Sequence, residues 1–91
     1  MITPACVESM TKLRFSPWRV RVWRTEVSVE DYYHNDDLEA AVLEMAAIKA
    51  KHRQEVRVSD LAKCLLSLDR VNAVEVVDEK GNGIVLYREW P

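Results

Sequence analysis

The feature that most constrains the fold is a period of two residues at the start of segment 18–29 (WRVRVWRTEVSV). Successive side chains of a β-strand point to opposite faces of the sheet, so Val20 and Val22 share one face. Arg19 and Arg21 share the other face. The segment is therefore predicted to be a half-buried antiparallel strand, with an apolar core on one side and a cationic face on the other.

A helical period follows in residues 36–51. Asp36 is placed to cap a helix, with Glu39 three residues on in a capping-box arrangement. The acidic start and basic end of the segment suit the helix dipole. A shorter helix is predicted over about residues 59–68, with Ser59 as its cap. The expected core-facing apolar positions of the two helices are Leu38, Ala41, Val42, Met45, Ile48, Leu61, Cys64, Leu65 and Leu68.

The two ends of the chain complete the expected fold. Thr3 and Pro4 resemble a helix start, and apolar residues recur at helical spacing, so a helix is predicted over about 4–13. Near the other end, "DEKGNG" separates two valine- and isoleucine-rich runs, which predicts a β-hairpin whose turn uses glycine at positive φ. A helix over 68–79 is the alternative, but it would scatter apolar groups around its circumference, so the hairpin is favoured.

These elements predict a small single α+β domain over residues 1–91. Residues 1–14 form an N-terminal helix or arm, and residues 15–91 form the core. The expected order is helix, strand, helix, helix, β-hairpin, with an antiparallel sheet. Six side chains are expected to pack against that sheet: Leu38, Val42, Met45, Ile48, Leu61 and Leu65.

Part of the chain resembles the winged helix-turn-helix superfamily. The resemblance rests on EVRVSDLAKCLLSLDRV, residues 55–71, where a short strand leads into a Ser-Asp-Leu-Ala helix start and a turn at Leu66–Ser67. It extends over about residues 37–89 and implies a recognition helix that has Val71 as its first buried residue and ends at residues 78–81, followed by a β wing. Many members of that superfamily serve as protein-docking modules. The acidic balance of residues 67–80 suits docking to protein better than binding to phosphates.

Charge is segregated along the chain although the net charge is only −2. Residues 1–24 carry five basic side chains and one acidic one, whereas residues 25–47 carry seven acidic side chains and no lysine or arginine. Such a pattern favours charge-matched docking over general polyanion binding.

The residues that could support catalysis or bind a metal are scattered. Cys6, His34, His52 and Cys64 lack the paired spacing of structural zinc sites, and no local signature joins Cys6 to His34 as a nucleophile and base. Cys64 is expected to be a buried small hydrophobe. No metal, cofactor or enzymatic activity is therefore predicted.

The cationic strand face has three interpretations: a solvated face, a protein contact, or a stacking platform for nucleic acid. The solvated face is the simplest. The function predicted is nevertheless a non-enzymatic binding module, a regulator, adaptor or inhibitor that docks a protein partner. The acidic run is expected to accept a basic partner or the basic strand of a second copy, giving a homodimer. The residues predicted to bind the partner are Arg19, Arg21, Trp23, Arg24, Glu30, Asp36 and Asp37.

The alternative function is DNA or RNA binding by the basic strand and the end of the long helix. Its residues are Arg19, Arg21, Lys49, Lys51, Arg53 and Arg57. No apolar run approaches the roughly 20 residues that span a bilayer, and "MITPACVESM" lacks the pattern of a secretory signal. A cytoplasmic location without membrane association is therefore expected.

Overall fold

The computed structural model describes the backbone of residues 6–25 and 29–88, and the side chains of residues 8–25 and 37–88. The chain forms two strands, two helices and two further strands. Their bounds are β1 Cys6–Lys12, β2 Arg19–Thr25, α1 Val29–Lys51, α2 Val58–Leu66, β3 Val71–Val77 and β4 Gly83–Tyr87. The predicted α+β class is confirmed.

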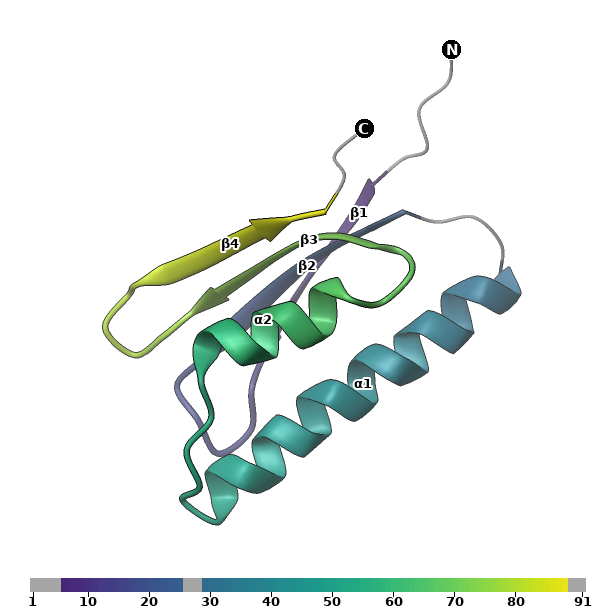
Figure 1. Ribbon diagram of the computed structural model, residues 1–91. Helices are drawn as coiled ribbons and strands as arrows, with labels where there is room; N and C mark the ends of the chain where they lie inside the picture. The colour runs from purple at the N-terminus through teal and green to yellow at the C-terminus, as the bar shows by residue number, and fades with distance from the viewer. Residues whose placement is uncertain (1–5, 26–28, 89–91) are drawn as a thin grey trace.

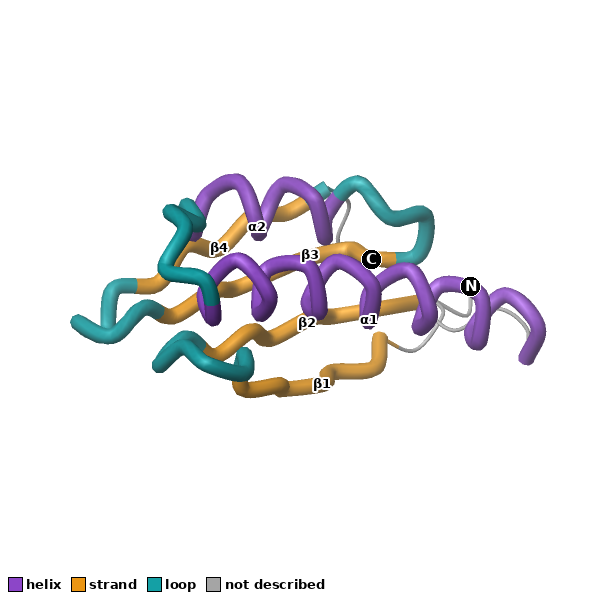
Figure 2. Tube along the Cα trace, turned by 90° about the horizontal axis from the view of Figure 1, so that it is seen from below, coloured by secondary structure: helices purple, strands orange, loops and turns teal. Residues whose placement is uncertain are grey.

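The four strands form one antiparallel sheet in the order β1-β2-β3-β4. Both helices are inserted between β2 and β3, and both lie on the same face of the sheet (Figure 1). Seen from the helical side, α2 lies over β3 and β4, while α1 runs along β2 and extends past the ends of the strands (Figure 2). Across the described residues, neither helix has the length and apolar composition needed to cross a bilayer.

The core lies between the helices and the covered face of the sheet. The valines at the centre pair across the strands, Val20 with Val76 and Val22 with Val74, and all four are at most 1% exposed. From the helical side, Leu61 and Leu65 of α2 fill the space above them. The alternation predicted for the strand at 18–29 is confirmed over the described residues 19–25.

The N-terminal helix predicted over residues 4–13 is wrong, because residues 6–12 form the edge strand β1. β1 pairs with β2 from Cys6 opposite Thr25 to Lys12 opposite Arg19. The apolar spacing of this segment also fits a helix. Its β-branched Val7 and Thr11 favour a strand, and the neighbouring β2 supplies the hydrogen bonds that decide between the two.

The C-terminal hairpin is confirmed as β3 and β4. In its turn, the Asp78 carboxylate oxygen Oδ1 accepts hydrogen bonds from the backbone N–H groups of Lys80 and Asn82, both at 2.9 Å. Gly81 takes the predicted positive φ of 81°, whereas Gly83 begins β4. The segment that the winged-helix resemblance assigns to a recognition helix is therefore strand β3, as the simpler α+β interpretation expects.

α1 differs from its prediction in the residue at which it begins and in the side chains that it turns toward the sheet. It begins at Val29, so Asp36 lies inside the helix and does not cap it. The face toward the sheet carries small residues, with Ala46 and Ala47 at most 5% exposed. The expected packing of Leu38, Met45 and Ile48 against the sheet is wrong, since these side chains are 41%, 55% and 49% exposed. α2 begins at Val58, and its N-cap is Arg57, not Ser59.

α1 ends in a Schellman motif that has arginine where glycine is preferred. The Gln54 N–H donates to the Lys49 carbonyl at 2.9 Å, the Arg53 N–H donates to the Ala50 carbonyl at 3.1 Å, and Arg53 has a φ of 57°. Because a side chain in the left-handed region is strained, we expect Arg53→Gly to raise the free energy of unfolding by about 0.5–1 kcal/mol. Urea denaturation measures this change. Gly81→Ala is the reciprocal control and should lower stability; a loss of stability in Arg53→Gly would contradict the argument.

Candidate functional site

The face of the sheet opposite the helices is open and carries a mixture of aromatic, aliphatic and charged side chains. We call it the open sheet face. The strand registers place on it Glu8, Met10 and Lys12 of β1, Arg19, Arg21 and Trp23 of β2, Ala73, Glu75 and Val77 of β3, and Gly83, Val85 and Tyr87 of β4. The predicted cationic face of the strand is thus the middle of a broader surface.

A charge cluster lies at the centre of the open sheet face. Arg21 Nε is 3.2 Å from Glu8 Oε1, and Arg21 Nη1 is 3.7 Å from Glu75 Oε1. The Arg21 guanidinium also stands 5.7 Å from the centroid of the Trp23 ring. Two carboxylates from the neighbouring strands therefore offset the one cation. The centre of the face is held in a fixed geometry and has little tendency to attract a polyanion.

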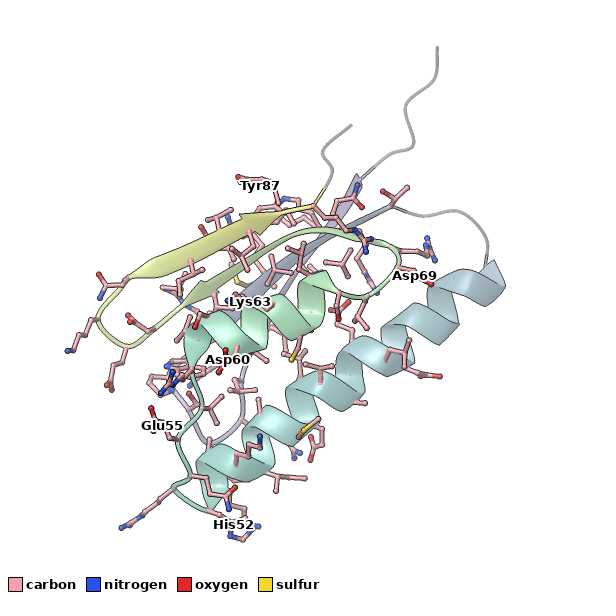
Figure 3. All side chains as sticks on the ribbon, viewed as in Figure 1. His52, Glu55, Asp60, Lys63, Asp69 and Tyr87 are labelled. Atoms are coloured by element: carbon pink, nitrogen blue, oxygen red, sulfur yellow. The ribbon has the colours of Figure 1, made fainter. Side chains whose placement is uncertain are left out.

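An aromatic row crosses the sheet beside this cluster. The register places Trp23 next to Ala73 and Ala73 next to Tyr87, so two aromatic side chains flank a small residue on one face. Tyr87 is 63% exposed, and its side chain points away from both helices (Figure 3). Met10 and Val85, 47% and 38% exposed, add aliphatic surface in the adjacent row.

The opposite end of the face is basic. Lys12 and Arg19 are cross-strand neighbours on β1 and β2, and both are exposed. Their row continues with Val77 and Gly83, which contribute no charge. Within the described part of the chain, neither cation has an ion-pair partner. The face thus runs from an aromatic row, through a neutralised centre, to two available positive charges.

Arg24, which was predicted to bind the partner, does not lie on this surface. It projects to the covered side of β2, where it is 5% exposed. Its Nη1 lies 3.5 Å from Oε2 of Glu39 on α1. A buried charge of this kind requires an opposite charge, so Arg24 connects the sheet to α1 instead of contacting a partner.

The acidic residues predicted to form a second patch lie on α1. Glu30 and Asp36 are inside the helix, but their side chains are outside the described residues; Asp37 is described and exposed. The basic residues of the nucleic-acid alternative are divided. Arg19 and Arg21 lie on the open sheet face, whereas the remaining four lie on the helical layer and its connecting loop: Lys49, Lys51, Arg53 and Arg57. They do not form one continuous strip with the strand.

Cys64 is a free, exposed thiol, which corrects the expectation that it would be buried. It lines a groove between α1 and α2 and does not point into the core. The side chains of Cys6 and His34 lie outside the described residues. Among those described, no three histidine, cysteine or acidic side chains gather as a metal site would require.

Several members of the open sheet face were missed from the sequence. Glu8 and Met10 were missed because their segment reads as a helix. Val85 and Tyr87 were within the predicted hairpin, and the alternation of β4 was the signal that could have placed them on one face. Glu75 required the register of β3 against β2, which no local pattern reveals.

Comparison with known proteins identifies no relative. No protein-family model matches the sequence, and neither the curated proteins nor the solved structures include a significant match. The chemistry of the open sheet face is therefore the basis for inferring a function.

Proposed function

We propose that the protein is a non-enzymatic docking module that binds a protein partner through the open sheet face. The partner surface would place an apolar side chain on the row formed by Trp23, Ala73 and Tyr87. It would place carboxylates on Lys12 and Arg19. The aromatic row carries the proposal, because tryptophan, tyrosine and arginine dominate the energetics of protein interfaces.

The packing of the face supports this assignment. Its residues stand on four hydrogen-bonded strands above a core of fully buried valines, so the side chains are presented by a rigid support. A rigid surface loses little conformational entropy on binding. The free, exposed thiol of Cys64 is consistent with the reducing cytoplasm in which we propose that the module acts.

Single-stranded nucleic acid is the alternative ligand. In proteins that bind single strands, bases stack on aromatic side chains of a sheet surface and cations at its edge contact the phosphates. Here Trp23 and Tyr87 would supply the stacking surfaces, and Arg19 would supply the cation. Two carboxylates count against this alternative. Glu8 is the cross-strand neighbour of Trp23, and Glu75 lies in the row beside it, where a phosphate backbone would be repelled.

Trp23→Ala tests the proposal. A tagged wild-type domain should capture one protein from the native host, and Trp23→Ala should weaken the dissociation constant of the purified pair by about 30-fold, as expected for a central interface residue. A Lys12→Glu/Arg19→Glu variant alters exposed residues only and should weaken the complex similarly. Gln54→Ala, at an exposed position after the end of α1, is the control that should bind normally. Urea denaturation confirms that each variant is folded.

Two results would count against protein docking. Equal binding by wild type and by both sheet variants would remove the open sheet face as the site. Binding of an oligothymidylate that falls steeply with salt and is lost in Trp23→Ala would favour the nucleic-acid alternative.

A further inference from the structure

A second surface lies on the opposite side of the molecule, along the outside of α1. We call it the outer stripe and define it as Leu38, Ala41, Met45 and Ile48. All four are exposed, the three large side chains by 41%, 55% and 49%. Their spacing of three, four and three residues places them along one side of the helix, in the pattern of a coiled-coil seam.

The outer stripe is not required for packing within the chain. The face of α1 toward the sheet is formed by other residues, among them the buried Ala46, Ala47 and Glu39. A helix that is apolar on two sides is typically covered on both. In this structure α1 is covered on one side only, as the view from the helical side shows (Figure 2).

The stripe is continuous with an apolar groove between the two helices. Met45 belongs to both, and the groove of about 220 Å³ is also lined by Val42, Leu61 and Cys64. Lys49 and Asp60 stand at its border. A helix lying on the outer stripe would therefore contact α2 as well as α1.

The charges on α1 indicate which helix fits there. The first half of α1 is acidic and includes the exposed Asp37, whereas its last turn carries Lys49 and Lys51. Neither Asp37 nor Lys51 has an ion-pair partner among the described side chains. An antiparallel copy of α1 brings the acidic half of one helix to the basic end of the other. A parallel copy would oppose like charges.

The residue spacing defines a register for this antiparallel pair. Leu38 of one copy would lie opposite Ile48 of the other, and Ala41 opposite Met45. On one flank of the seam, the same register brings Asp37 of one copy near Lys51 of the other, and the two-fold symmetry repeats each pair. The two outer layers thus pair leucine with isoleucine, the two inner layers pair alanine with methionine, and an acid–base pair lies at each end.

We propose that two copies of the chain associate through antiparallel contact of their outer stripes. The proposal is independent of the open sheet face, which lies on the other side of the sheet. Because the seam has only four layers, the dimer should be weak, and its population should rise between about 1 µM and 1 mM protein.

Sedimentation equilibrium over this concentration range tests the proposal. Wild type should approach twice the mass of one chain, and Met45→Glu should remain a monomer because it places a charge in the middle of the seam. Val85→Glu introduces the same charge on the open sheet face and should dimerise as wild type does. Circular dichroism verifies that both variants are folded. A monomeric wild type, or loss of the dimer in Val85→Glu, would overturn the proposal.

A charge-reversal experiment tests the antiparallel register. Lys51→Asp should weaken the dimer about tenfold, since it creates two Asp–Asp contacts per dimer. The double variant Asp37→Lys/Lys51→Asp should restore wild-type affinity. Both positions are exposed, so neither variant threatens the fold. A double variant as weak as Lys51→Asp would overturn the register and, with it, the choice of a second copy as the partner.

Discussion

Replacing Glu39 with alanine is expected to destabilise the domain by about 3–5 kcal/mol, because it removes the carboxylate beside the buried Arg24 guanidinium. The two side chains are only 6% and 7% exposed, and their Nη1 and Oε2 atoms are 3.5 Å apart. A domain of this size has a total stability of about 5–15 kcal/mol, so the loss is a large fraction of it. Urea denaturation of the variant measures the effect.

The chain contains a matched control for this experiment. Arg57 and Glu55 also have a nitrogen–oxygen distance of 3.5 Å, but their side chains are 71% and 80% exposed. Glu55→Ala should therefore change stability by less than about 1 kcal/mol. Replacing both buried partners with apolar residues, as in Arg24→Met/Glu39→Leu, should restore most of the stability lost in Glu39→Ala. Equal effects of Glu39→Ala and Glu55→Ala would show that burial does not determine the strength of these pairs.

The second large effect is expected for Leu65→Ala, at about 2–5 kcal/mol. Leu65 has no exposed surface and fills the space between α2 and the valines of the sheet. Its truncation removes buried apolar area and leaves a cavity that the surrounding side chains cannot close completely. Chemical denaturation by urea again gives the change in the free energy of unfolding.

Met45→Ala is the comparison for Leu65→Ala. It removes a similar volume from a helix, but Met45 is 55% exposed. At a protein concentration low enough to keep the chain monomeric, we expect a change of no more than about 0.5 kcal/mol. A loss in Met45→Ala as large as that in Leu65→Ala would mean that the outer stripe packs within the chain. That result would contradict the observed direction of the α1 faces.

Leu65 on α2 and Met45 on α1 also show which helix orientations can be predicted from the sequence and which cannot. α2 was oriented correctly because its apolar residues lie on one face, so Leu61 and Leu65 could face only the core. α1 has a larger apolar stripe on its outer side than toward the sheet, where alanines and the Glu39–Arg24 pair make the contact. A rule that sends the largest apolar stripe to the core therefore oriented α1 incorrectly.

Only the part of the candidate site that lies on β2 could be predicted from the sequence. The alternation in β2 placed Arg19, Arg21 and Trp23 together and Arg24 opposite them, since this depends only on neighbours along the chain. The rest of the open sheet face depends on pairing between strands. Glu8 and Tyr87 reach it through registers set by residues far away in the sequence, so local patterns could not identify them.

Because both helices cover the same face of the sheet, the dimer would have two partner-binding sites. If two chains associate through α1, the helices form the middle of a four-layer arrangement, and the two sheets turn their free faces outward in opposite directions. Each dimer would then have two equivalent contact sites that cannot reach the same spot on a partner. Such a bivalent particle would bind a repetitive target with avidity and could crosslink it, even if each single contact were weak.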